Sequence, residues 1–196
     1  MKIINVLGSP RTTGNSAAIA HTLLEILQKH GNQVRTFELN KLTYQGCQGC
    51  MACKTNSGQC VIKDDLSGVL EEVRTSDVVI ISSPVYFGEI TAQTKGLFDR
   101  FYSYYAPDYR TNPNASRLAP GKKIVFIITQ GNPDEKAFAD LIPRYTGIFS
   151  RLGFNEINSI RGLGMGPESD SVINETLKQL INDTAKKIMG GSGTSR

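Results

Sequence analysis

Runs with strand character alternate with amphipathic segments along the whole chain of 196 residues, and this alternation constrains the fold more than any other feature. Strands that alternate with helices through short connections form parallel sheets with right-handed crossovers. We therefore expect a single α/β domain built on a doubly wound five-stranded parallel sheet. The five expected strands are KIINVLG, QVRTFEL, VVIISSPV, KIVFIITQG and NEINSIRGLG.

The spacing of apolar residues predicts a helix after each strand. After Asn15, apolar side chains recur at i, i+3, i+4 and i+7 until Gly31, which is typical of a helix end. The remaining helices are expected at 64–73, 91–105, 136–153 and 173–188, with a kink or break near Pro143. The domain is expected to span residues 1–189, with residues 190–196 as a flexible tail.

Charge and hydropathy exclude several classes of partner. The formal charge of +4 is scattered, and the longest basic run is a pair such as Lys122 and Lys123, so a nucleic-acid partner is not expected. No apolar stretch approaches the roughly 18 residues of a membrane span. The opening residues, MKIINVLGSP, turn polar too early for a signal peptide. We expect a cytoplasmic protein without a membrane partner.

The stretch VLGSPRTTGNSAAIA, residues 6–20, joins the first strand to the first helix and is rich in hydroxyl groups. It is not a Walker A loop, because five residues separate Gly8 from Gly14 and Asn15 stands where the lysine belongs. The dinucleotide pattern G-x-G-x-x-G is also missing. Arg11 and the start of a helix could hold one phosphate monoester without a metal. The alternative is an ordinary strand-to-helix turn with a polar cap.

Two further polar segments should reach the same edge of the sheet, where ligands bind in doubly wound folds. SPVYFGEI, residues 83–90, places aromatic side chains there, which favours a flat ligand over bare surface. The alternative is that Tyr86 and Phe87 pack in the core or at a subunit contact. TQGNP, residues 129–133, offers backbone amides near Gly131. Together the three loops favour FMN over a nucleoside triphosphate.

GSPRTTGNS, SPVYFGEITAQTKGLFDR and TQG resemble the flavodoxin-like NADPH-dependent FMN reductase family, over most of the chain to about Gly131. The cysteine segment followed by VIKDDL resembles the iron-sulfur flavoprotein branch. The resemblance implies a flavodoxin-like fold and FMN as cofactor. It implies phosphate binding by Ser9, Arg11, Asn15, Ser16 and Ala17, and contact with the isoalloxazine ring by Pro84, Val85, Tyr86, Phe87, Gly88, Gln130 and Gly131.

The four cysteines, Cys47, Cys50, Cys53 and Cys60, all lie within residues 47–60. In a reducing compartment such a group holds a metal or does redox chemistry. The first three have the spacing that wraps thiolates around one cubane, and Cys60 can supply the fourth ligand of a [4Fe–4S] cluster. Two alternatives stay open. The thiols could be free or reversibly oxidised, or they could bind zinc, whose sites usually come as two separated C-x2-C pairs.

Acid–base machinery is not evident in the sequence. His21 and His30 belong to the first helix, and Asp64 and Asp65 are expected to begin a helix. The chemistry would then be that of FMN, which accepts a hydride and releases electrons singly. We expect an FMN-dependent oxidoreductase that relays electrons between a [4Fe–4S] cluster and FMN. The alternatives are an NAD(P)H-dependent reductase of FMN or a quinone with metal-free cysteines, and a non-enzymatic redox or metal sensor.

The segment RFYSYYAPDYR, residues 100–110, concentrates tyrosine and arginine, a composition that favours interfaces. We expect a homo-oligomer, a dimer or tetramer, in line with the resemblance. The alternative is that these tyrosines cover the chain's own connection to LAPGKKIVFI. The expected electron donor or acceptor is a ferredoxin or a small molecule.

Overall fold

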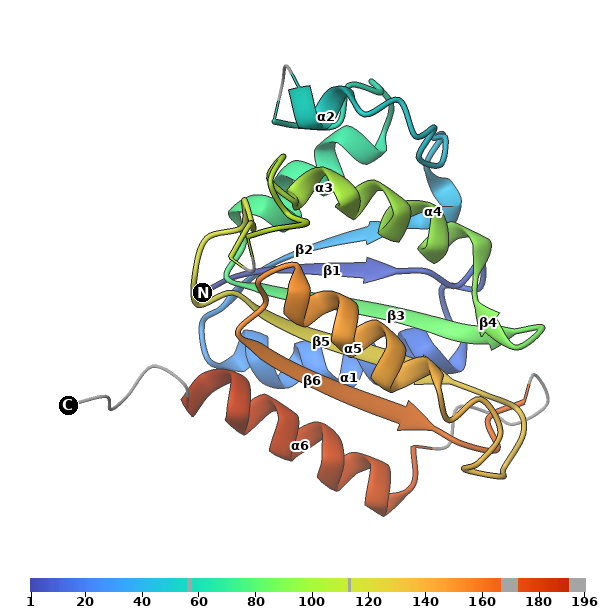
Figure 1. Ribbon diagram of the computed structural model, residues 1–196. Helices are drawn as coiled ribbons and strands as arrows, with labels where there is room; N and C mark the ends of the chain where they lie inside the picture. Colours follow the sequence, from blue (N-terminus) through green and yellow to red (C-terminus); the bar gives the residue numbers. More distant parts are fainter. Residues whose placement is uncertain (56–57, 113, 167–172, 191–196) are drawn as a thin grey trace.

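A twisted parallel sheet forms the centre of the molecule in a computed structural model that describes residues 1–55, 58–112, 114–166 and 173–190 (Figure 1). Its parallel strands are β1 (Lys2–Leu7), β2 (Gln33–Glu38), β3 (Val78–Tyr86), β5 (Lys123–Thr129) and β6 (Glu156–Gly162). They lie in the order β2-β1-β3-β5-β6, which confirms the expected doubly wound, flavodoxin-like sheet. One strand was not expected: β4 (Glu89–Ile90) pairs antiparallel with the end of β3.

Helices cover both faces of the sheet (Figure 1). One face carries α1 (Asn15–Lys29) and α6 (Glu175–Gly190), and the other carries α3 (Leu66–Thr75), α4 (Ala92–Arg100) and α5 (Leu141–Arg151). The strands are therefore buried on both sides, which explains their nearly continuous apolar runs. Three short helical turns lie outside these layers: η1 (Leu39–Lys41), α2 (Ala52–Thr55) and η2 (Phe101–Tyr104).

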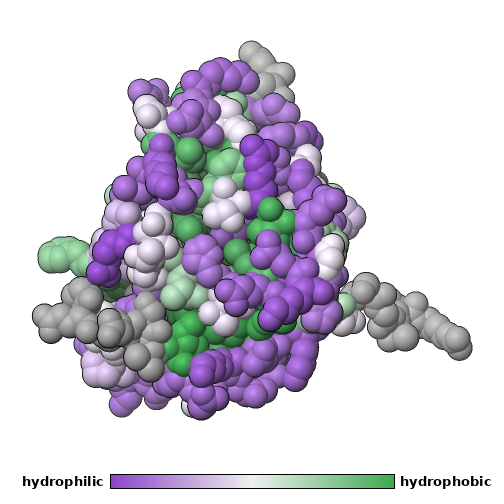
Figure 2. Space-filling view, turned by 180° about the vertical axis from the view of Figure 1, so that it is seen from behind, coloured by the Kyte–Doolittle hydropathy of each residue, from purple (hydrophilic) through white to green (hydrophobic). Residues whose placement is uncertain are grey.

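The exposed large apolar side chains are not scattered evenly. Hydrophilic residues dominate the rear face in Figure 2, and hydrophobic colour is confined to patches between them. Met51 is exposed in the cysteine segment, residues 47–60, and Val61 directly after it. Tyr86 is exposed at the end of β3, and Phe87 and Phe138 are exposed in loops beyond the carboxyl ends of the strands. Exposed apolar groups that gather in this way mark binding surfaces more often than single ones do.

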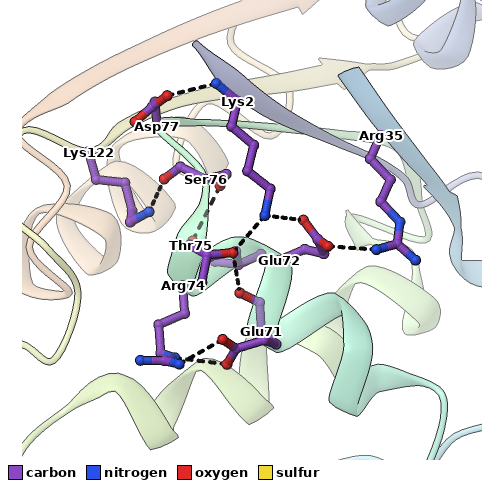
Figure 3. Close-up of polar contacts among 10 residues, drawn as sticks. Lys2, Arg35, Glu71, Glu72, Arg74, Thr75, Ser76, Asp77 and Lys122 are labelled. Atoms are coloured by element: carbon purple, nitrogen blue, oxygen red, sulfur yellow. Dashed lines mark hydrogen bonds and ion pairs between the residues drawn. The ribbon is translucent and has the colours of Figure 1, made fainter. Parts of the chain in front are cut away.

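A polar network at the amino ends of the strands joins β1 and β2 to α3 (Figure 3). Glu72 accepts ion pairs from Lys2 at 2.8 Å and from Arg35 at 2.6 Å. Nearby, the buried Lys122 donates a hydrogen bond to the carbonyl of Ser76. Burial lowers the pKa of the Lys122 ammonium to about 8, although the Asp77 carboxylate opposes this. The network lies at the opposite end of the sheet from the three polar loops that are expected to bind a ligand. Its contacts stabilise the fold.

The helix expected over 136–153 begins five residues late, at Leu141. The cause is a distant side chain, because the guanidinium of Arg161 on β6 takes the carbonyls of Glu135, at 2.8 Å, and Ala137 as acceptors. Those carbonyls would otherwise begin the helical hydrogen-bond ladder. Phe138 also has a φ of 59°, which no α-helix accommodates.

Of the kink or break expected near Pro143, the chain has a break, since the helix begins only at Leu141. Because α5 begins at Leu141, Pro143 lies in its first turn. The amides of a first turn have no partner within the helix, so a proline there removes no helical hydrogen bond. Because the helix begins late, Pro143 does not interrupt its hydrogen bonds.

The last helix also differs in detail from the expectation. Gly190, expected in the flexible tail, is the last residue of α6, and residues 191–196 lie outside the described part of the chain. Ile173 precedes the helix. Leu180 is exposed, whereas Leu177, Ile181 and Ile188 pack on the sheet.

Candidate functional site

Three loops beyond the carboxyl ends of β1, β3 and β5 surround one hollow, which we call the three-loop hollow. The loops come from parts of the chain far apart in sequence and meet because parallel strands end at a common edge. Most of the residues expected to bind FMN line this hollow, and three that were not named do so as well. The lining residues are Ser9, Arg11, Asn15, Ser16, Pro84, Val85, Tyr86, Thr129, Gly131, Met165 and Gly166.

Gly8 fixes the position of the first loop, which follows β1. A Cβ atom at this position would lie 1.8 Å from Oγ1 of Thr94, so only glycine allows β1 to approach α4 this closely. The Gly8 amide donates to the carbonyl of Ser82 at 2.8 Å, and the Thr91 hydroxyl donates to the carbonyl of Gly8 at 2.7 Å. The phosphate-type loop is therefore fixed to β3 and to the start of α4.

The amino end of α1 faces the three-loop hollow. Gly14 precedes the helix and no side chain caps it, so the first-turn amides and the positive end of the helix dipole are available there. The hydroxyl oxygen of Ser16 is buried and has no hydrogen-bond partner in the described part of the chain. Arg11 is exposed beside it, and the backbone amide of Arg11 donates to Oγ of Ser9 at 3.1 Å. An orphaned hydroxyl, a helix start and a guanidinium fit a phosphate group.

Asn15, which is expected to bind phosphate, also makes two contacts within the chain. Its side-chain nitrogen donates to the carbonyls of Met165, at 3.0 Å, and Gly166, at 3.1 Å. It thereby ties the loop after β6 to the start of α1. This contact spans 150 residues, and it explains why Met165 and Gly166 line the hollow although the local sequence pattern did not single them out.

The neighbouring aromatic residues Tyr86 and Phe87 lie in different surroundings. Tyr86 lines the hollow with 42% of its surface exposed, whereas Phe87 is fully exposed and is not among the lining residues. Phe87 and Gly88 have left-handed backbones, with φ of 49° and 85°. The turn between β3 and β4 therefore directs Tyr86 and Phe87 to different sides.

Two other expected cofactor residues are placed behind the hollow. The side chain of Ala17 is fully buried in the core beneath α1. Gln130 is also buried, and its side chain is fully engaged: it accepts from Arg161 at 2.6 Å and donates to the carbonyls of Asn132 and Asp134. Gln130 therefore shapes the third loop from within, and its neighbours Thr129 and Gly131 reach the hollow.

The four cysteines line a second hollow, the cysteine hollow, together with Arg100, Tyr102 and Ser103. All four are free thiols. Burial raises the pKa of the Cys53 thiol, and the charges of the other three cysteines raise it further, while Lys54 opposes them. Cys53 therefore lies near enough to the other three cysteines to feel their charges.

The donor set fits a four-thiolate metal centre in number and chemistry. Among the described residues, however, no group of three or more His, Cys, Asp or Glu side chains is arranged to hold a metal ion directly. Cys47 and Cys50 are exposed, Cys53 is buried and Cys60 is half-buried. Ligation of one centre would require the four thiols to come closer together.

A buried ion pair closes the cysteine segment. Arg100 donates to the carboxylate of Asp64 at 2.8 Å and also to the carbonyls of Gln45, at 3.1 Å, and Ile62, at 3.0 Å. Burial opposes ionisation of Asp64, but hydrogen bonds from Arg100 and from two backbone amides hold its pKa below the ordinary value. Helix α3 begins at Leu66, directly after the expected pair Asp64 and Asp65, and Oδ1 of Asp64 accepts from the Leu66 amide at 3.1 Å. Its pairing with Arg100 was not expected.

Helix α4 connects the two hollows. Its cap residue Thr91 binds the Gly8 carbonyl beside the three-loop hollow, and its last residue, Arg100, lines the cysteine hollow. The nine residues of α4 span about 13 Å at roughly 1.5 Å per residue. Helix α4 therefore runs from the loop beside the three-loop hollow to the wall of the cysteine hollow.

The tyrosine segment packs largely on its own chain. Tyr104 is buried, and its hydroxyl donates to the carbonyl of Leu70 at 2.8 Å. Tyr105 forms an isolated bridge with Ser116, and Tyr102 and Tyr109 share a hydrogen bond of 2.8 Å. The tyrosines thus cover the chain's own connection to LAPGKKIVFI. The oligomeric state stays a prediction.

The two histidines lie outside both hollows. His21 is exposed on α1 and His30 is exposed at its end, and neither lines a hollow. The helices in the described ranges are too short or too polar for any of them to cross a bilayer.

Sequence comparisons give iron-sulfur flavoproteins as relatives. The chain is 36% identical over 138 residues to an iron-sulfur flavoprotein of Archaeoglobus fulgidus, which covers 70% of this chain and 59% of that protein. It is 37% identical over 100 residues to one of Methanocaldococcus jannaschii, which covers 51% of each chain. The matches therefore span between about half and three fifths of the length of these curated relatives.

Comparison with solved structures supports the same fold. The NAD(P)H:quinone oxidoreductase of Methanothermobacter marburgensis superimposes with a TM-score of 0.70 and 15% identity, over 100% of this chain and 99% of that one. A family model described as the flavodoxin-like fold matches residues 1–184. With the strand order observed above, this match shows that the chain belongs to the family with the flavodoxin-like fold.

Proposed function

We propose that this protein is an FMN-dependent oxidoreductase that carries electrons between FMN and a [4Fe–4S] cluster. The observation that carries the proposal is the three-loop hollow at the carboxyl edge of the sheet, with a helix start and the orphaned hydroxyl of Ser16 on its wall. The relatives named as iron-sulfur flavoproteins support the pairing of the two groups.

In this proposal the first loop binds the phosphate of FMN. Arg11 and Ser9 supply a cation and a hydroxyl, and Ser16 supplies the hydroxyl that has no partner. The first-turn amides, including that of Ala17, add the positive end of the α1 dipole. Asn15 holds this loop against the one after β6.

The second and third loops take the ring system. Pro84, Val85 and Tyr86 form one wall, and Thr129 and Gly131 form the other. Phe87 and Gly88 shape the rim, and Gln130 supports the third loop from behind. When bound, FMN accepts an electron pair as hydride and passes electrons on singly. The chain binds and orients the ring, and its apolar walls limit the access of water.

The cysteine hollow takes the second group. Cys47, Cys50, Cys53 and Cys60 would be the ligands, and their thiols must lose their protons to bind iron. The Arg100–Asp64 pair and its carbonyl contacts hold the segment at both ends while the exposed thiols turn inward.

A second candidate function is an NAD(P)H-dependent reductase of FMN or a quinone whose cysteines bind no metal. It is favoured by one observation, the lack of a preformed metal-ligand group among the described residues. The names of solved structures with the same fold are compatible with it, although the likeness itself shows the fold alone. Steady turnover with NAD(P)H favours this candidate, and reduction only by a ferredoxin favours the electron carrier.

We also infer a cytoplasmic homo-oligomer, a dimer or tetramer. A reducing compartment suits four free thiols. Assembly would suit the chemistry, because the cysteine segment of one subunit could approach the flavin of another more closely than the length of α4 allows within one chain.

The test is a pair of variants of protein purified without oxygen. The wild-type protein should contain about one FMN and about four irons per chain. Cys50→Ser should lose iron and keep FMN, whereas Arg11→Ala should lose FMN affinity and keep iron. Stoichiometric zinc without iron would reject the cluster, and an absence of FMN from all three proteins would reject the flavin site.

A further inference from the structure

Two cations near the cysteine hollow have no carboxylate partner among the residues that the structure describes. Lys54 follows Cys53 directly and is 8% exposed. Its ammonium donates to the carbonyls of Tyr102, at 2.5 Å, and Tyr105, at 2.7 Å. It also lies 4.0 Å from the centre of the Tyr102 ring. Lys54 therefore joins the cysteine segment to the chain that follows α4.

Arg117 makes the same connection from the other side. One of its nitrogens donates to the carbonyls of Cys53, at 2.8 Å, and Gly58, at 3.1 Å. The same nitrogen donates to the carbonyl of Ser103 at 3.1 Å. Arg117 thus holds the backbone of one proposed ligand and the stretch that leads to Cys60.

Carbonyl oxygens, and for Lys54 the Tyr102 ring, contact both charges, but neither has a carboxylate counter-ion in the described part of the chain. The nearby carboxylates of Asp64 and Asp99 are paired with Arg100 and Lys95. Partly buried charges without counter-ions cost free energy, so an anion bound beside them would stabilise the arrangement.

The proposed centre supplies that anion. Four thiolates and an oxidised [4Fe–4S] core carry a net charge of about −2, and the charge around such a centre helps to set its potential. Resting on the proposed function, we propose that Lys54 and Arg117 are positioning residues of the cysteine centre, which hold its loop by backbone carbonyls and neutralise its two negative charges.

The test compares charge-removing with charge-keeping variants of the anaerobically purified protein. Lys54→Met and Arg117→Gln remove one charge each, whereas Lys54→Arg and Arg117→Lys keep it. Lys63→Gln is the matched control, because Lys63 is an exposed lysine of the same segment. The readouts are the midpoint potential of the iron centre and the rate of iron loss to a chelator.

The charge-removing variants should shift the potential to more negative values, since each added electron then meets less positive charge. They should also lose iron about 10-fold or more faster, the range for outer partners of metal ligands. The charge-keeping variants should stay near the wild-type potential, and so should Lys63→Gln. Unchanged FMN content in every variant shows that the fold is intact.

The outcomes separate this inference from the function on which it rests. Wild-type protein that binds FMN but no iron overturns the proposed cluster and, with it, the role of both cations. Iron-loaded wild-type protein whose potential is the same in Lys54→Met, Arg117→Gln and Lys63→Gln overturns this inference alone. A purely structural clamp would change iron retention and leave the potential of the iron that remains unmoved, which also contradicts the proposal.

Discussion

The guanidinium of Arg100 lies 2.8 Å from the carboxylate of Asp64, and this ion pair closes the cysteine segment on itself. The Arg100 side chain is fully buried and that of Asp64 is 13% exposed. Arg100 holds the carbonyls of Gln45 and Ile62, one on each side of the four cysteines. The segment is thereby anchored at both ends, whatever its thiols bind.

Replacement of Asp64 by asparagine should destabilise the protein strongly. The change leaves the buried charge of Arg100 without its counter-ion, and breaking a buried pair in this way costs about 3–5 kcal/mol. Urea denaturation of the two proteins measures the difference in the free energy of unfolding. The control is Asp183→Asn, which removes an exposed ion pair on α6 and should cost less than about 1 kcal/mol.

Acid should erase the difference between wild type and Asp64→Asn. Because the pKa of Asp64 is lowered in the folded protein, its stabilising contribution is complete above the ordinary value of 3.8 and is lost as the pH falls below it. The two unfolding free energies should converge as the pH falls below about 4. A gap that persists unchanged in acid would show that the charge of Asp64 is not what stabilises the segment.

Lys122 should make stability rise with pH in the alkaline range. Its pKa is lowered from 10.5 to about 8 in the folded protein, so between these values the unfolded chain binds more protons than the folded one. Relative to Lys122→Met, the free energy of unfolding of the wild type should rise by about 2–3 kcal/mol from pH 7 to pH 10. Lys29→Met, which removes an exposed lysine, is the control: the difference in the free energy of unfolding between this variant and the wild type should stay constant over the same pH range. Parallel curves for Lys122→Met and wild type would contradict the lowered pKa.

Arg11→Ala should weaken FMN binding by about 1.5–3 kcal/mol, the range for a hydrogen bond to a charged group. Quenching of flavin fluorescence during titration of the apoprotein measures the affinity. Lys29→Ala changes an exposed cation at the other end of the same helix and serves as the control. Equal FMN affinities of Arg11→Ala and Lys29→Ala would show that this loop does not bind the phosphate of FMN.

Sedimentation should show a dimer or tetramer at micromolar concentration. The chain mass is 21.4 kDa, so a dimer would sediment near twice and a tetramer near four times this value. A single species near the chain mass would contradict the assembly. The cysteine segment would then have to act on the flavin of its own chain.

Local patterns predicted the elements that local forces decide. The β-branched runs became the parallel strands, and the stretch between Gly8 and Ser16 became a loop that opens a helix beside the three-loop hollow. The position of Gly8 explains this success. The glycine itself is visible in the sequence, whereas the close approach of Thr94 that requires it is seen only in the structure.

The missed features depend on contacts between distant residues. Arg161 delays the start of α5 by taking carbonyls more than 20 residues away, and Asn15 brings Met165 to the hollow across 150 residues. The resemblance implies Gln130 as a flavin contact, and the sequence gives no sign that its buried side chain accepts a hydrogen bond from Arg161. No periodicity or motif encodes such pairings, because either partner alone is compatible with many folds.

A reductive titration without oxygen shows whether one chain holds both FMN and a cluster. Dithionite is added stepwise to the purified protein, and the absorbance of the flavin and of the iron centre is followed. FMN takes up two electrons and a [4Fe–4S] cluster one, so we expect an uptake of about three electrons per chain. Uptake of two electrons by an iron-free protein would contradict it, and so would uptake of one electron by a protein without flavin.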